Sequence, residues 1–298
     1  MTMDLIEKTA ALDREIRLEQ DFERYVLGND RVEVSTVPEL GAKIVSLKNL
    51  RTGREWMWHP AAGLKLFRNH PRDDFSASPL VGMDECLPTI APCEWEKRKL
   101  TDHGEVWCRP WCVDHSAWDR GVLKTSIRLC FSPLDFERAL ELRENEVLLN
   151  YRLQNRSQGQ EPFLWAMHPL LRLRSGDGLV LPASTRSLLK EHNWIDAVDS
   201  AIPGGGCSKL FAWPLSEGFA GIHNQNTGDW LQFEWSPVEN NTLGLWRSCG
   251  GWYGHDHFAI EPTNANGDSL DQAARQKRCR VLAASETATW QIRLRVGP

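Results

Sequence analysis

The chain has 298 residues, of which 41% are hydrophobic and 25% are charged, so its composition excludes an extensively disordered chain. The formal net charge of -5 gives no reason to expect nucleic acid or an anionic membrane as the main partner. The first twenty residues are punctuated by charge and contain no apolar run long enough for a signal peptide or a membrane span. We therefore expect a cytoplasmic protein with a large hydrophobic core.

The N-terminal part of the chain predicts a helix followed by antiparallel strands. Residues 4–25 combine apolar positions with charges as a short amphipathic helix does, within an N-terminal extension of residues 1–28. Residues 31–37 and 42–50 then carry the alternating pattern of strands, and residues 51–55 have the composition of a hairpin turn.

The remaining chain continues with strand signals. Alternating runs cover residues 124–133 and 137–145, residues 146–157 pair naturally with the latter, and residues 287–296 place their apolar side chains on one face. We find no series of βαβ units, no Gly-rich phosphate loop after a strand, and no internal repeat or linker. The pattern predicts an all-β fold, a large antiparallel β-sandwich in one domain over residues 1–298.

The eight cysteines predict reduced thiols, because a chain of this length does not need a disulfide framework and has no secretory signal. Cys108 and Cys112 have the spacing of half a metal site, but no second pair at zinc-site spacing follows. We expect no metal site.

Two stretches, FLWAMHPLLRL (163–173) and FAIEPTNANGD (258–268), hold a titratable residue in an apolar run directly before a proline: His168 and Glu261. Proline cannot donate to a strand ladder, so each strand is at an edge, at a bulge or ending there. Such a position projects a side chain into a cleft from a rigid support, as a general acid and a general base require. A satisfied structural histidine and a turn carboxylate remain the alternative interpretation.

Other stretches offer further polar side chains in aromatic or apolar surroundings. Asp84 and Glu85 precede a Pro-rich apolar turn, and His103 is followed by a glycine and two tryptophans. The GHDHF sequence puts His255 and His257 on one strand face. Without a third ligand, we interpret that pair as structural or substrate-lining.

The order and context of these stretches resemble the aldose 1-epimerase (galactose mutarotase-like) family. VPELGAKIVSLKNLRTGREWMW is similar to the family's opening strands, LLNYRLQNRSQGQEPFLWAMHPLLRL to its central histidine pattern, DHGEVW to its earlier His-Gly segment and FAIEPTNANGDSL to its late glutamate segment. The resemblance extends from about Val32 to Val296. It implies a β-supersandwich in which His168 is the general acid, Glu261 the general base, and His103 helps to hold the sugar.

The segment GMDECLPTI stands where galactose-type members have an Arg-rich segment, so Asp84 and Glu85 are predicted to replace those hydroxyl contacts. Three of the 14 tryptophans, Trp107, Trp165 and Trp246, are candidates to stack on the sugar face, with core packing as the alternative. Arg247 lies near a motif segment and would suit a phosphorylated sugar, although scattered basic residues are usually solvated.

These assignments predict a cofactor-independent enzyme that interconverts the α and β anomers of an aldose or an aldose derivative by general acid–base ring opening. One alternative is a non-catalytic sugar-binding protein on the same fold, which would not need His168 and Glu261 together. Another is a polysaccharide lyase or hydrolase, for which Glu261 with Asp84 or Glu85 is the carboxylate pair. We expect a small-molecule sugar as the partner, and a monomer or a homodimer.

Overall fold

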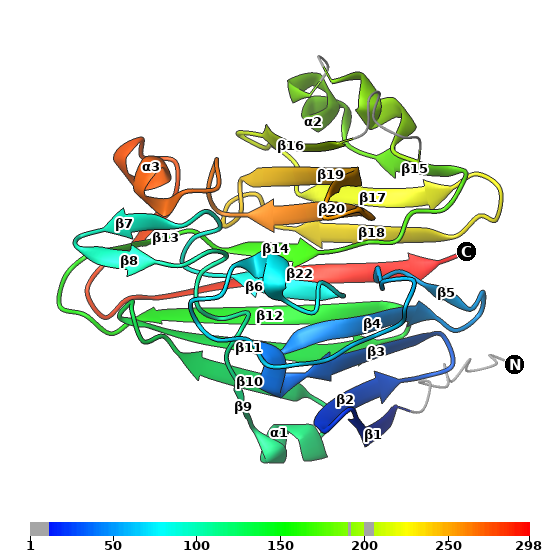
Figure 1. Cartoon of the computed structure of the whole chain (residues 1–298), viewed down its shortest axis with the longest axis horizontal. Helices are drawn as coiled ribbons and strands as arrows, with labels where there is room; N and C mark the ends of the chain where they lie inside the picture. The colour runs from blue at the N-terminus through cyan, green and yellow to red at the C-terminus, as the bar shows by residue number, and fades with distance from the viewer. Residues whose placement is uncertain (1–11, 190–191, 200–205) are drawn as a thin grey trace, which may run out of the picture.

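The computed structural model describes residues 12–189, 192–199 and 206–298. Within these ranges the chain forms two large antiparallel sheets that overlap in projection in Figure 1. Side chains from both sheets form one hydrophobic cluster, so the sheets pack face to face. The predicted all-β sandwich is confirmed.

In the described ranges the first sheet contains ten strands. Across the sheet these are β1 (Asp13–Glu19), β2 (Phe22–Gly28), β3 (Val32–Val37), β4 (Lys43–Asn49), β6 (Met83–Cys86), β14 (Ala166–Pro169), β20 (His255–Thr263), β19 (Thr242–Trp252) and β16 (Gly206–Ala212), with β5 (Arg54–Glu55) paired to β4.

The second sheet contains eight strands among the described residues. They are β15 (Asp177–Val180), β17 (Phe219–Asn224), β18 (Trp230–Trp235), β22 (Thr287–Gly297), β12 (Glu146–Asn155), β11 (Leu134–Arg143), β10 (Leu123–Arg128) and β9 (Cys112–Val113). Two small ribbons pair β13 (Glu161–Phe163) with β21 (Arg280–Leu282) and β7 (Cys93–Trp95) with β8 (Arg98–Leu100).

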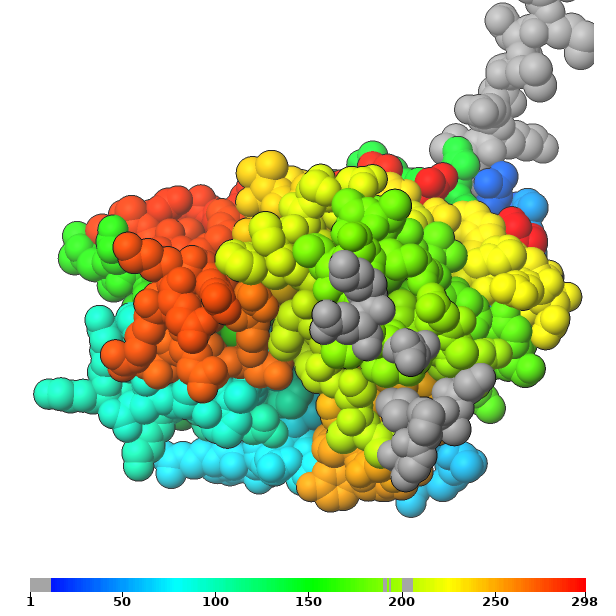
Figure 2. Space-filling model, turned by 90° about the horizontal axis from the view of Figure 1, so that it is seen from above, coloured from blue at the N-terminus to red at the C-terminus, as the bar shows by residue number. Residues whose placement is uncertain are grey.

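Helical segments are short and connect strands. They are η1 (Pro38–Leu40), η2 (Phe75–Ala77), α1 (His115–Asp119), α2 (Ala183–Leu188), η3 (Asn193–Ala197) and α3 (Leu270–Arg275). Helix α3 and the β7–β8 ribbon lie side by side at one end of the molecule (Figures 1 and 2). None of the helices in the described ranges has the length and apolar character to cross a lipid bilayer.

The N-terminal helix prediction is wrong over the residues that the structure describes, where β1 and β2 form a hairpin. Gln20 and Asp21 both have positive φ, 51° and 70°, which gives the two-residue turn that such hairpins use. Strand β2 then pairs with β3 and buries Tyr25 and Leu27 in the core. Pairing of β1 with β2, and burial of β2 in the core, therefore outweigh the helix-like spacing. Residues 1–11 of the predicted helix lie outside the described residues.

Strand β14 explains how a histidine stands within an apolar run. Successive side chains point to opposite faces of a sheet, and Met167 packs into the cluster between the two large sheets. His168 therefore points away from that core, toward the outer face of the first sheet. The apolar neighbours fill the core, and the same strand presents the histidine on its other face.

Candidate functional site

His168 and Glu261 are brought together by the register of β14 on β20. One antiparallel register joins Ala166 with Thr263 and Leu171 with Phe258, and in that register His168 lies opposite Glu261. The distance from His168 Nδ1 to Glu261 Oε1 is 3.1 Å. Both side chains are buried, at 7% and 0% exposure.

The Glu261 carboxylate also accepts a hydrogen bond from Lys209 Nζ on its second oxygen. Burial alone would raise the pKa of Glu261, but the charge of Lys209 and the charge and hydrogen bond of His168 outweigh it and lower the pKa to about 2. Burial would lower the pKa of Lys209, but the charges of Glu261 and Asp268 raise it. The two groups therefore hold each other in the ionised state at neutral pH.

The Glu261 side chain has room because the neighbouring strand has no side chain opposite it. Strand β19 lies between β16 and β20, and Gly244 on β19 is paired with Phe211 on one side and with Glu261 on the other. A Cβ at Gly244 would lie 3.1 Å from Glu261 Oε2 and 3.2 Å from Glu261 Cβ. Glycine at this position therefore leaves the space that the Glu261 side chain occupies.

His103 faces His168 from a loop, with 5.2 Å between the ring centroids. Its Nδ1 lies 2.9 Å from Asp102 Oδ1, and its ring stacks on Phe75 at 3.9 Å. Burial lowers the pKa of His103, although Asp102 acts in the opposite direction. With Nδ1–H donated to Asp102, the neutral ring has Nε2 as a hydrogen-bond acceptor.

The backbone conformation explains why a glycine, Gly104, follows His103. His103 and Gly104 both have positive φ, and a Cβ at Gly104 would lie 2.0 Å from the carbonyl oxygen of Leu87. Glycine is thus required where this loop touches the segment after β6. The contact holds His103 at the edge of the site.

These groups surround a cavity of about 170 Å³. It is lined by three histidines, one lysine, one aspartate and four apolar or aromatic side chains: His103, His168, His257, Lys209, Asp268, Phe75, Ile90, Trp246 and Trp252. Of the residues singled out from the sequence, His103, His168, Trp246 and His257 line this cavity, and His255 does not. Glu261 lies directly behind His168 and Lys209.

Lys209, Asp268, Phe75 and Trp252 were not among the predicted site residues. Lys209 belongs to a strand of ordinary alternating character, so its role follows only from the register of β16 on β19. Phe75 and Trp252 come from a short 3₁₀ segment and from the irregular end of β19. No local sequence signal marks these positions.

Asp84 and Glu85 are not among the residues that line the cavity, so their assignment as sugar contacts stays a prediction. Asp84 is fully buried and ion-paired with Lys43. Glu85 accepts hydrogen bonds from Arg138 Nη1 at 2.9 Å and Tyr151 Oη at 2.9 Å. Each carboxylate therefore has a buried partner, and Glu85 joins β6 of the first sheet to β11 and β12 of the second.

Three other predicted contacts are also positioned differently. Trp165 lies in the core between the sheets and donates from Nε1 to Glu85 Oε2 at 2.8 Å. Trp107 supports the site from behind, with Nε1 donating to the Asp102 carbonyl oxygen at 3.0 Å and its ring against Phe75. Arg247 follows Trp246 in the strand, so it points to the opposite face, where it donates to the Val198 carbonyl oxygen.

Within the described ranges, no group of three His, Cys, Asp or Glu side chains is arranged to hold a metal ion. Cys108 is buried and Cys112 is exposed, and they form no disulfide.

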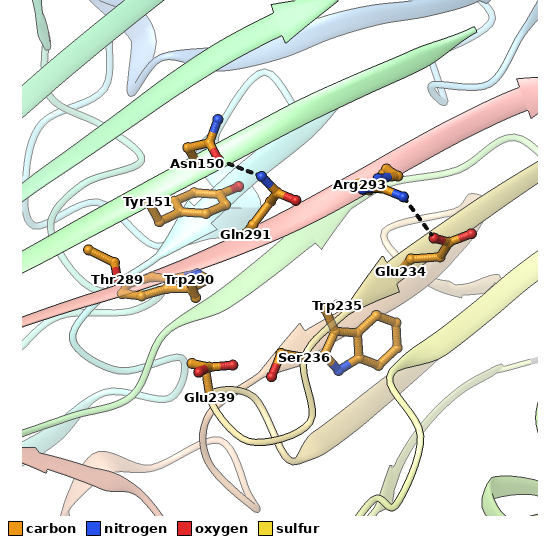
Figure 3. A pocket seen from close by; sticks show the side chains of 10 residues that line it. All are labelled: Asn150, Tyr151, Glu234, Trp235, Ser236, Glu239, Thr289, Trp290, Gln291 and Arg293. Carbon is orange, nitrogen blue, oxygen red and sulfur yellow. Dashed lines mark hydrogen bonds and ion pairs between the residues drawn. The ribbon is translucent and has the colours of Figure 1, made fainter. Parts of the chain in front are cut away.

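A larger hollow of about 700 Å³ lies over β12, β22 and β18 of the second sheet (Figure 3). Its outward side chains bind one another: Gln291 donates to Asn150 at 2.7 Å, and Arg293 is ion-paired with Glu234 at 3.6 Å. It contains no His, Lys or Cys in its lining. Its mutually paired side chains provide no evident acid–base pair, in contrast to the smaller cavity.

Comparison with known proteins identifies the fold. No protein-family profile matches the chain, and no curated protein has a significant match to its sequence. Solved structures do match over nearly the whole chain.

A proposed aldose 1-epimerase from Klebsiella pneumoniae has a TM-score of 0.74 at 14% identity, with 97% of this chain and 84% of that chain covered. A galactose mutarotase-like protein from Clostridium acetobutylicum has a TM-score of 0.71 at 14% identity, with 97% and 99% covered. A galactose mutarotase related enzyme from Lactobacillus acidophilus has a TM-score of 0.63 at 12% identity, with 92% and 97% covered. The resemblance predicted from the sequence is thus confirmed for the fold.

Proposed function

We propose that this chain, which has the galactose mutarotase-like fold, interconverts the anomers of an aldose by acid–base ring opening. The observation that carries the proposal is the buried contact between His168 and Glu261 beside a cavity lined by two further histidines and two tryptophans. An acid and a base within reach of one small molecule are what anomer exchange requires.

In the proposed reaction, Glu261 takes the proton of the anomeric hydroxyl and His168 gives a proton to the ring oxygen. The bond between C1 and the ring oxygen breaks, leaving an open-chain aldehyde. Rotation about C1–C2 presents the other face of the carbonyl, and closure returns both protons. His168 contacts Glu261 through Nδ1, so its Nε2 is the nitrogen that would serve the ring oxygen.

Glu261 is ionised, as a base must be, but both of its oxygens already have partners. The anomeric hydroxyl must therefore join or replace one of these partners at the carboxylate. A carboxylate has about four lone-pair sites, so it can accept the hydroxyl while it keeps Lys209. Lys209 would then preserve the charge of the base while the sugar is bound.

The dimensions and charges of the cavity favour an uncharged monosaccharide. Its volume of about 170 Å³ is below the roughly 300–1,000 Å³ typical of sites for larger ligands, so it would enclose one sugar ring. Its lysine, Lys209, is already engaged by Glu261 and Asp268. The same size argues against a polysaccharide lyase or hydrolase, and the carboxylates nominated for that reaction, Asp84 and Glu85, have buried partners.

The test is anomer exchange measured by magnetisation-transfer NMR with a panel of neutral, phosphorylated and acidic sugars. We expect the wild type to accelerate exchange of a neutral aldose. Glu261→Gln and His168→Ala should each lower turnover by roughly 10²–10⁴-fold. Anomer-selective line broadening without faster exchange would instead favour a sugar-binding protein, and no effect on any sugar would contradict both.

A further inference from the structure

His257 is a buried polar group that takes no part in the proposed proton transfers. It lines the cavity and is 1% exposed. Neither Nδ1 nor Nε2 has a hydrogen-bond partner within the part of the chain that the structure describes. Buried polar side chains nearly always have a partner in folded proteins, so an unpartnered imidazole facing a cavity indicates a bound group.

The surroundings of His257 hold its ring in place and keep it neutral. Trp58 and Trp252 contact the ring edge-to-face, with centroid distances of 5.4 and 5.7 Å. Burial, together with the nearby charges of His168 and His255, lowers the pKa of His257 to about 3. A neutral imidazole offers one donor and one acceptor, which complements a group that can both accept and donate.

The position of His257 along β20 relates it to the reacting end of the cavity. His257, Ala259 and Glu261 point to the same face of the strand. At about 3.4 Å per residue, the Cα atoms of His257 and Glu261 are roughly 14 Å apart. This span exceeds one sugar ring, so one sugar meets both residues only where their long side chains incline toward the cavity between them. Ala259 between them has only a methyl group, and Trp246 lies beside it in register. A ligand can therefore lie along the strand, with Glu261 near one end and His257 near the other.

We propose that His257 hydrogen-bonds a hydroxyl group of the bound sugar at the end of the cavity away from Glu261, and so helps to select the sugar. The identity of the ligand as a sugar rests on the proposed function. A hydroxyl both donates and accepts, so it can satisfy the neutral ring through either nitrogen. A phosphate dianion only accepts, and it would meet a ring without positive charge.

The test measures the binding of D-glucose, D-galactose and D-xylose, each by NMR titration, to the wild type and to His257→Leu. We expect at least one aldose to bind, and its affinity to fall about tenfold in the variant, as for the loss of one hydrogen bond in a dry site. His255→Leu is the matched control. Its ring lies 6.5 Å from that of His257 on the same strand face and contacts Trp58, but it is not among the residues that line the cavity.

A second pair of variants separates hydrogen bonding from packing. Asn and Gln each retain one donor and one acceptor, near the positions of Nδ1 and Nε2 respectively. We expect His257→Asn or His257→Gln to recover most of the affinity that His257→Leu loses. A deoxy analogue that lacks the contacted hydroxyl should bind the wild type about tenfold more weakly than the parent sugar does. The analogue and the parent sugar should bind His257→Leu with equal affinity.

Equal affinities for the wild type and a folded His257→Leu, or a wild type that binds none of the three aldoses, would overturn this inference. Anomer exchange measured on the same samples reports separately on the proposed function. Binding that depends on His257 without any exchange would overturn the proposed function and leave the inference standing.

Discussion

The Glu261 carboxylate combines complete burial with full ionisation, and Lys209 is the side chain that reconciles the two. Burial favours the neutral acid, whereas a cation at hydrogen-bond distance favours the anion. A base whose pKa is about 2 is always ready to act at neutral pH, but it binds a proton weakly. Lys209 therefore determines both the availability and the strength of this base.

Replacing Lys209 with Met should raise the pKa of Glu261, because the burial that raises it remains and its strongest opposing charge is removed. An opposite charge at this range accounts for about 1–3 pKa units. We expect the acidic limb of the pH profile of anomer exchange to move upward by that amount. Lys209→Arg, which keeps the charge, should leave the limb close to its wild-type position. An unmoved limb in Lys209→Met would show that Lys209 does not control this carboxylate.

His257 should make the free energy of unfolding depend on pH between the pKa values of this residue in the folded and unfolded chain. Its pKa is about 3 in the folded protein, against about 6.5 for an unfolded histidine. The unfolded chain therefore binds the extra proton, so this contribution to stability is complete above pH 6.5 and is lost as the pH falls toward 3. At pH 5 the wild type should have lost about 2 kcal/mol of unfolding free energy on this account.

The measurement is urea unfolding at pH 7 and pH 5 for the wild type and for His257→Gln. Other histidines contribute equally to both proteins, so the difference between them isolates His257. A variant that loses as much stability as the wild type between these two pH values would contradict the assignment.

At the level of elements, the site depends on the close approach of three strands, β16, β19 and β20. Gly244 is the point at which β19 leaves room for the Glu261 side chain. Gly244→Ala places a methyl group closer to Glu261 than ordinary van der Waals contact allows, so the carboxylate must give way by a few tenths of an ångström. Because a misplacement of about 1 Å can lower a rate by roughly 10²-fold, we expect this smaller shift to lower turnover by about 2- to 10-fold.

Gly28→Ala is the control for this change. A Cβ at Gly28 meets its nearest atom at 3.8 Å, which is an ordinary contact, and Gly28 is at the end of β2 in the same sheet. We expect wild-type turnover from this variant. Wild-type turnover from Gly244→Ala as well would show that the space at Gly244 is not needed.

The strands with a strong apolar pattern were predicted from the sequence, and the first hairpin was not. Residues 31–37, 42–50 and 287–296 correspond to β3, β4 and β22; burial alternates along β22, whereas almost every residue of β3 and β4 is buried. In β1, by contrast, nearly every side chain is exposed, so its sequence carries little hydrophobic signal. Pairing with β2 makes it a strand, and that partner is recognisable only once the turn is known.

At the scale of the whole molecule, buried ion pairs connect the two sheets. Arg54 of β5 donates to Asp177 of β15 at 2.9 and 2.6 Å, and Glu85 of β6 binds Arg138 of β11. All four side chains are almost completely buried. Losing one partner from such a pair leaves an uncompensated charge in the core.

Glu85→Ala should therefore lower the free energy of unfolding by about 3–5 kcal/mol, as measured by urea denaturation. Turnover per folded molecule should stay at the wild-type value, because Glu85 is not among the residues that line the cavity. Lost turnover in a fully folded sample would support Glu85 as a sugar contact.

The sequence predicted part of the candidate site, namely the residues whose local sequence context is distinctive. His168 and Glu261 stand out locally, because each is a titratable residue in an apolar run before a proline. Asp84 and Glu85 carry the same kind of local signal, yet their partners Lys43 and Arg138 are distant in the chain. Whether a buried carboxylate serves chemistry or a core ion pair depends on such partners, which a single sequence does not reveal.

The contact between His168 and Glu261 joins residues 93 positions apart in the chain, and it exists only when β14 is paired with β20. Such long-range pairing must overcome the entropy of closing a long loop, and it forms slowly compared with local structure. No short fragment of the chain can then assemble the acid–base pair. Recovery of activity after dilution from denaturant should report the completion of the first sheet, which makes catalysis a folding probe.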